Sequence, residues 1–64
     1  MSTSAVATLT VMMEHLVEYQ ARVMAIAGDL AGGRHEDAVA VLHEADRNLR
    51  LAARTLRRAA QLIG

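Results

Sequence analysis

Hydrophobic residues recur at helical spacing along the first half of the chain. Leucine or valine returns every seventh residue, and a second apolar series fills the intervals in steps of three and four. This spacing places a continuous apolar seam along one side of a helix. We therefore predict a helix from about residue 4 to residue 31, with the hydroxyl of Ser4 (or Thr3) capping its first turn. The predicted seam consists of Ala5, Leu9, Met12, Leu16, Tyr19, Val23, Ile26 and Leu30.

The second half of the chain carries a more regular repeat, in which large and small residues alternate. It predicts a second helix from about residue 35 to residue 63, with the carboxylates of Glu36 and Asp37 near the positive end of its dipole. Gly32 and Gly33 supply the left-handed backbone that ends the first helix and define a turn at residues 32–34. The fold class is therefore all-α, one antiparallel two-helix hairpin domain over residues 1–64. The large seam residues of the second helix are Leu42, Leu49, Leu56 and Ile63, and the small ones are Ala38, Ala45, Ala52 and Ala59.

Folding the chain about residue 34 places large residues of one helix opposite alanines of the other, so that the helices can approach closely. The same register brings opposite charges level with each other. These pairs are Glu14 with Arg54, Glu18 with Arg50, and Arg22 with Asp46.

The first helix carries more apolar surface than one neighbouring helix can cover. A second apolar stripe, with Val6, Met13, Val17 and Met24 as its main members, lies beside the seam. Burial of each such side chain contributes up to about 1.5–3 kcal/mol, so two chains gain enough to offset an association cost of roughly 4–15 kcal/mol. We expect these four residues to mediate self-association into a homodimeric four-helix bundle, or a tetramer. Another helical protein is the alternative partner, because methionines repack readily against varied surfaces.

Composition removes several other classes of protein. The chain has no cysteine, which excludes disulfides and thiolate metal sites. Its formal net charge is zero, so the overall field favours no particular partner. The uncharged N-terminal segment ends at Glu14, short of the roughly 18 apolar residues that a membrane span needs. We expect a soluble cytoplasmic protein without a membrane contact.

Arginines gather on the outer side of the second helix, at steps of three and four residues. This ridge could contact the phosphates of nucleic acid, or simply solvate the helix and complement its C-terminal dipole. No aromatic residue stands beside it to stack on a base. The residues are Arg47, Arg50, Arg54, Arg57 and Arg58, of which the last four are the candidate contacts.

Two architectural resemblances bear on function. In length and plan the chain resembles the plasmid copy-number proteins, helical hairpins that pair as four-helix dimers and bind paired RNA loops; it shares no motif with them, and no residue role is carried over. His43-Glu44 resembles the phosphoacceptor helix of sensor histidine kinases. The phosphoacceptor there normally lies on the first helix of its hairpin, and a surface histidine is the favoured interpretation.

The remaining chemistry is sparse. His15 and Glu18 are one turn apart, but the Glu-x-x-His ligand pair of carboxylate-bridged bundles is missing. No glycine-rich phosphate loop and no nucleophile with an adjacent base is present. We expect no metal, no cofactor and no enzymatic activity. The leading hypothesis is a homo-oligomeric protein-interaction module with a regulatory or scaffolding role, and the alternative is a nucleic-acid-binding regulator.

Overall fold

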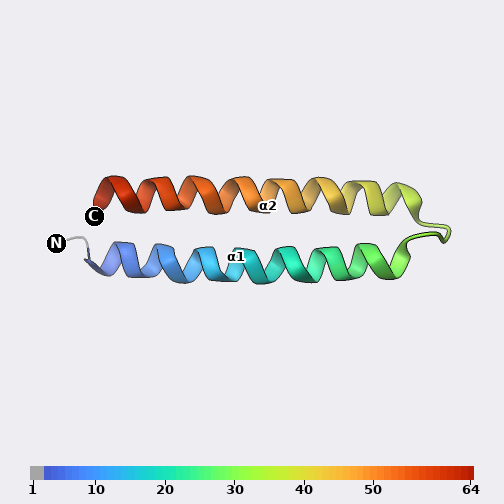
Figure 1. Cartoon of the computed structure of the whole chain (residues 1–64), viewed down its shortest axis with the longest axis horizontal. Coiled ribbons are helices and arrows are strands. Elements are labelled where there is room, and N and C mark those ends of the chain that lie inside the picture. The colour runs from blue at the N-terminus through green and yellow to red at the C-terminus, as the bar shows by residue number, and fades with distance from the viewer. Residues whose placement is uncertain (1–2) are drawn as a thin grey trace.

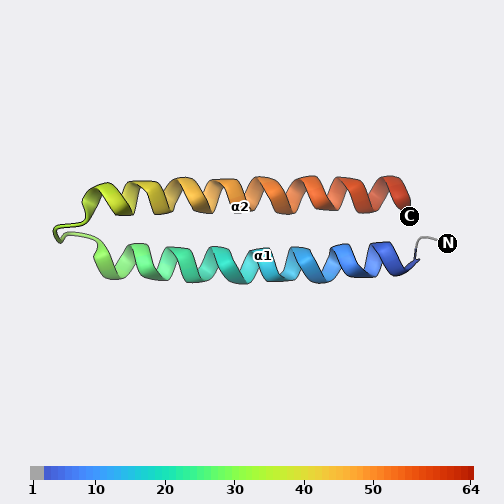
Figure 2. The same ribbon diagram turned by 180° about the vertical axis from the view of Figure 1, so that it is seen from behind.

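The chain forms two long helices that lie side by side in opposite directions. The computed structural model describes residues 3–64 and consists of α1 (Thr3–Leu30) and α2 (Glu36–Ile63), each of 28 residues. Figures 1 and 2 show the hairpin from its two broad sides, with the start of α1 and the end of α2 at the end opposite the turn. The Cα trace extends over 52 × 14 × 9 Å. The prediction of an all-helical hairpin is confirmed.

The helix ends differ slightly from the predicted ones. α1 already includes Thr3, so Ser4 lies in its first turn, where its carbonyl accepts a hydrogen bond from Thr8 Oγ1 at 2.9 Å. The prediction that Ser4 caps the helix is therefore wrong, and the alternative cap, the side chain of Thr3, lies outside the described residues. At the other end α1 stops at Leu30, one residue earlier than predicted, and α2 begins one residue later.

The connection between the helices depends on one glycine in the left-handed region. Gly32 has φ +81°, and the amide of Gly33 donates to the carbonyl of Leu30 at 3.2 Å. The amide of Gly32 donates to a carboxylate oxygen of Glu36, which ties the turn to the first residue of α2. His35 precedes α2 without a capping bond from its side chain. The turn is thus held by backbone geometry and one carboxylate.

The two helices meet along a seam with a strict seven-residue repeat. Leu9, Leu16 and Val23 are half-buried at this interface, as are the leucines of α2 at positions 42, 49 and 56. Only two apolar side chains in the described part of the chain are buried, Ala27 at 2% exposure and Val39 at 8%. The half-buried residues that complete the seam are Val6, Met13, Gln20 and Leu30 of α1, and Ala38, Ala45, Ala52, Ala53, Ala59 and Ala60 of α2.

The structure corrects the predicted seam of α1. Met12, Tyr19 and Ile26 are 44%, 47% and 50% exposed, so they do not form the core of the single hairpin. The series Val6, Met13, Gln20, Ala27 occupies the seam instead. The cause is a rotation of α1 around its axis by roughly 50°, half of the angle between successive residues, since Leu9, Leu16 and Val23 stay in the seam. Ile63, also predicted as core, is 43% exposed at the end of α2.

The predicted register places Met12 beside Leu56 and Leu16 beside Ala52, and these four residues line one hollow between the helices. A hydrogen bond of 3.3 Å from Gln20 Nε2 to Asp46 Oδ1 also joins the helices. None of the three predicted pairs of opposite charges forms an ion pair. The ion pair present among residues 4–64 lies within α2, between Asp46 and Arg50.

Neither helix within residues 3–64 is apolar enough over a sufficient length to cross a bilayer.

Candidate interaction surface

An open apolar groove runs between the helices on one broad side of the hairpin. Its volume is about 750 Å³. The half-buried Leu16, Ala52 and Leu56 lie between more exposed residues that rise on either side, Met12 and Tyr19 among them. The other lining residues are His15 on α1 and Asn48, Leu51 and Thr55 on α2. The hollow therefore opens to solvent with a largely hydrocarbon surface.

The groove belongs to a longer apolar face, because its residues recur every seventh position on both helices. On α1 the repeat is Met12, Tyr19 and Ile26, and on α2 it is a series of alanines. Residues seven apart lie on the same side of a helix, so the surface continues along the hairpin beyond the hollow. We call this surface the groove face; it comprises Ala5, Met12, Tyr19 and Ile26 of α1 and Ala38, Ala45, Ala52 and Ala59 of α2, flanked by Val41, Leu51 and Thr55.

The residues predicted to mediate self-association do not lie together. Val6 and Met13 are half-buried in the seam of the hairpin. The side chain of Val6 lies against Gly64, the residue after α2, so that a Cβ added to this glycine would stand 3.0 Å from Val6 Cγ2. Val17 and Met24 are 59% and 37% exposed, on the side of α1 away from the groove face. The structure therefore gives these four residues two different environments.

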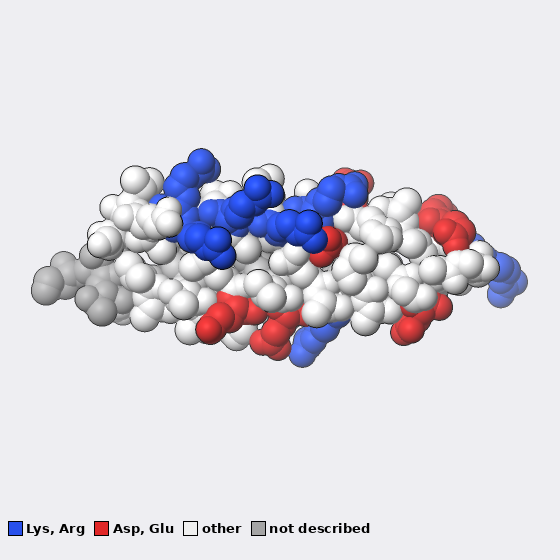
Figure 3. All heavy atoms as spheres, viewed as in Figure 1, with Lys and Arg blue, Asp and Glu red and all other residues white. Residues whose placement is uncertain are grey.

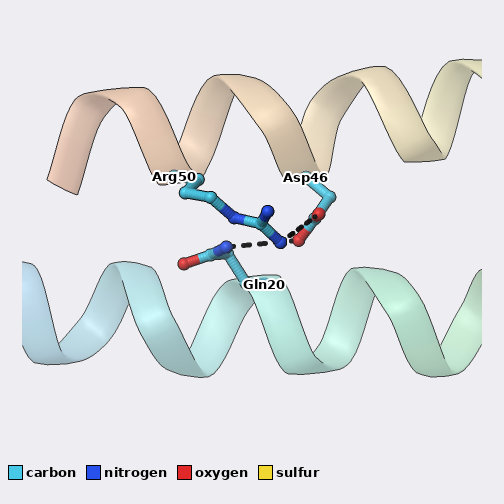
Figure 4. Close-up of polar contacts among 3 residues, drawn as sticks. All are labelled: Gln20, Asp46 and Arg50. Atoms are coloured by element: carbon cyan, nitrogen blue, oxygen red, sulfur yellow. Dashed lines mark hydrogen bonds and ion pairs between the residues drawn. The ribbon is translucent and has the colours of Figure 1, made fainter. Parts of the chain in front are cut away.

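A polar layer crosses the middle of the seam (Figure 4). Asp46 is buried, and its two carboxylate oxygens accept hydrogen bonds from Gln20 of α1 and, at 3.0 Å, from Arg50 Nη2 of α2. The guanidinium of Arg50 reaches back over its own helix and remains largely in solvent. Among the described residues no buried side-chain nitrogen or oxygen lacks a hydrogen-bond partner. The layer therefore satisfies a carboxylate that would otherwise be costly to bury.

This polar layer is the feature that the sequence analysis missed. Gln20 interrupts the series Val6, Met13, Ala27, and Asp46 interrupts the series Val39, Ala53, Ala60. Each looks like a surface residue when its helix is considered alone. The available signal was that each interruption is one polar residue within an otherwise apolar seven-residue series, one on each helix.

The arginines lie along one side of α2, as predicted. Figure 3 shows them as a row of basic side chains over that helix. All five are exposed, and only Arg50 forms an ion pair among residues 4–64. Arg50 and Ala52 are two positions apart and project from nearly opposite sides of α2. Towards the C-terminal end of α2 the arginine ridge borders the groove face, because Arg54, Arg57 and Arg58 line a second hollow with Leu51 and Thr55. We keep the name arginine ridge for Arg47, Arg50, Arg54, Arg57 and Arg58.

The histidines are dispersed. His15 lines the groove, His35 precedes α2, and His43 is exposed on α2. Within the described part of the chain no three histidine or carboxylate side chains are grouped so that they could hold a metal ion. The groove face and the arginine ridge are thus the two surfaces that the structure offers to a partner.

The chain was compared with family models, with curated proteins and with solved structures. None of the three comparisons found a match, so no fold, partner or activity is carried over from a relative.

Proposed function

We propose that the chain is a self-associating helical interaction module, in which two hairpins pair through their groove faces to form a four-helix bundle. The observation that carries the proposal is the groove face itself, a continuous apolar surface on a hairpin that encloses almost no core. Because the surfaces of the hairpin are suited to binding, we propose a regulatory or scaffolding role.

The small enclosed core is the first argument. Ala27 and Val39 are the buried apolar residues of the described chain, whereas ten large hydrophobic side chains are exposed. Small domains of this size obtain stability from disulfides, metals, oligomerisation or very close helix packing. Cysteine is absent from the sequence. Association is the source of stability that the exposed hydrophobic side chains support.

The size of the groove face is the second argument. From the Cα extents of 52 and 14 Å, one broad side of the hairpin has an area of about 700 Å², close to the ~800 Å² that each partner contributes to a standard interface. Met12, Tyr19, Ile26, Val41 and Leu51 are roughly half exposed or more. Covering the exposed half of each contributes about 0.8–1.5 kcal/mol, or roughly 8–15 kcal/mol over two chains, against an association cost of about 4–15 kcal/mol.

A pair of matched double variants tests the proposal. Met12→Glu with Tyr19→Glu places two carboxylates on the groove face, and Val17→Glu with Met24→Glu places two on the other side of the same helix. The mass of each protein is measured by light scattering at micromolar concentration, and circular dichroism monitors helix content. We expect twice the chain mass of 6.9 kDa for the wild type and the second variant, and monomers or unfolded chains for the first.

The reverse pattern would mean that Val17 and Met24 form the interface, as the sequence alone suggested. A wild-type protein that stays monomeric at about 100 µM, well above the ~1 µM dissociation constant of a modest complex, would overturn the proposal. Purification of a stable complex with a different helical protein on the same face would replace self-association by a heteromeric role.

The arginine ridge supports a second candidate function, which is binding to nucleic-acid phosphates. Arg54, Arg57 and Arg58 form no ion pair within residues 4–64 and line one hollow on α2 together with Leu51 and Thr55. Phosphate contacts make the logarithm of the binding constant fall with the logarithm of salt concentration, by about 0.9 per contact on duplex DNA. We expect such a slope for the wild type and a shallower one after Arg54→Ala and Arg57→Ala. Absence of binding at low salt would exclude this function.

A further inference from the structure

We infer that the two hairpins of the bundle pair with their turns at the same end, so that α1 of each chain lies along α2 of the other. The inference rests on the proposed function, because it takes the groove face as the contact between two copies. It adds the orientation of the partner, which decides which helix meets which.

The groove face is unequal in its two halves. α1 contributes the large side chains of Met12, Tyr19 and Ile26, which project about half exposed from the hairpin. α2 contributes an alanine at each of the corresponding positions, among them Ala45 and Ala52, which are half-buried. The seven-residue series of the face is therefore large on α1 and small on α2, whereas the larger side chains of α2, Val41 and Leu51, lie at the flank of the face.

The packing inside the hairpin already follows the same rule. The half-buried Leu16 of α1 and Ala52 of α2 line the groove together, and a step of seven residues in each direction sets Leu9 beside Ala59 and Val23 beside Ala45. A large residue on one helix thus lies opposite a small residue on the other. This alternation lets the two helix axes approach at a uniform distance.

Two symmetric arrangements bring the groove faces of two hairpins together. A two-fold axis along the hairpin places the turns at the same end and sets α1 opposite α2 of the partner. A two-fold axis across the hairpin places the turns at opposite ends and sets α1 opposite α1, and α2 opposite α2. Homodimers are overwhelmingly two-fold symmetric with the same patch on both subunits, so these are the two arrangements to distinguish.

Side-chain size favours the arrangement with the turns together. In that arrangement the series Met12, Tyr19 and Ile26 of one chain lies along the alanine series of α2 of the other, and the two contacts between chains are identical. With the turns at opposite ends, bulky side chains would meet bulky ones on the α1 side, and alanines would meet alanines on the α2 side. The distance between two packed helix axes varies over about 8–10 Å with the size of the contacting side chains. With the turns at opposite ends, the helix axes would therefore be farther apart on the α1 side of the bundle than on the α2 side.

Distance measurement between spin labels tests the orientation directly. The sequence has no cysteine, so Arg34→Cys gives one label per chain at the turn, away from the groove face. Turns at the same end place the two labels within about 30 Å, given helix separations of about 8–10 Å and flexible label arms. Turns at opposite ends separate them by a distance close to the 52 Å length of the hairpin.

Glu18→Cys serves as the matched control. Glu18 is exposed near the middle of α1, so its two labels are separated by similar, short distances in both arrangements. Light scattering and circular dichroism on the labelled proteins show whether each remains dimeric and helical. The control therefore reports association alone, and the turn label reports orientation.

The outcomes separate this inference from the proposed function. A dimeric mass with short distances at both sites supports the inference. A dimeric mass with a short distance at residue 18 and a long one at residue 34 overturns the inference and leaves the proposed function standing. A mixture of short and long distances at residue 34 also overturns it, because a single arrangement is then not specified. A monomeric mass removes the proposed function and the inference together.

Discussion

Replacement of Asp46 and Gln20 tests whether the polar layer stabilises the hairpin or only specifies its register. Asp46 is buried and accepts hydrogen bonds from Gln20 at 3.3 Å and from Arg50 at 3.0 Å. Buried charged groups are often less favourable than well-packed hydrophobic residues of similar volume, although removal of one partner alone is costly. The single and double variants should therefore change stability in opposite directions.

The magnitudes follow from the contacts. Asp46→Asn keeps an acceptor for Gln20 and loses the ion pair with Arg50, an i,i+4 pair that contributes about 0.3–0.5 kcal/mol. Asp46→Ala also loses the bond to Gln20, about 0.5–1.5 kcal/mol, and regains roughly 0.5 kcal/mol of helix propensity. Gln20→Leu combined with Asp46→Leu closes the apolar seam, and we expect it to raise the free energy of unfolding by about 1–3 kcal/mol.

Urea unfolding followed by circular dichroism measures all four proteins. They must be compared at one protein concentration, because association shifts the apparent stability. The expected order of stability is the double leucine variant, the wild type, Asp46→Asn and Asp46→Ala. A double leucine variant less stable than the wild type would refute the reasoning, since the layer would then contribute net stability that hydrophobic packing does not replace.

Three further results are expected. Gly28→Ala should raise the free energy of unfolding by about 0.5–1 kcal/mol, because an added Cβ meets nothing within 4 Å; a loss of stability would show that this part of α1 needs glycine. Gly32→Ala should lower it by about 1–2 kcal/mol, since Gly32 has φ +81°, whereas Gly33→Ala, at a residue without positive φ, should cost less. Tyr19 is the sole aromatic residue of the chain, so its near-ultraviolet circular dichroism should change with dilution in parallel with the mass; a change in mass without a change in the tyrosine signal would place the interface elsewhere.

The helices and the turn could be predicted from the sequence because each has a local cause. The seven-residue repeat, the paired glycines and the acidic start of α2 determine these elements without reference to the rest of the chain. The rotation of α1 could not be predicted in this way. Both neighbours of the Leu9–Leu16 series are apolar over much of their length, so the pattern alone does not select between Met12 and Met13.

The selection between those two neighbours is made by a polar contact. Gln20 can enter the seam only because Asp46 lies opposite, and Asp46 can be buried only because Gln20 and Arg50 supply donors. An interpretation based on apolar residues alone places Gln20 and Asp46 at the surface, although the two side chains can be buried together because they form a hydrogen bond. The groove face follows from the same rotation, since Met12, Tyr19 and Ile26 turn outward when Met13 and Gln20 turn inward.

The near absence of enclosed side chains has a consequence for the behaviour of the protein in a cell. Ala27 and Val39 are the buried apolar residues of the described chain, so the free energy of unfolding of a single copy is small. If the groove face is covered by a second copy, folding becomes a second-order process, and the folded fraction rises with the amount of protein synthesised. Expression level would then set activity without any small-molecule signal, and dilute chains would be open to proteolysis.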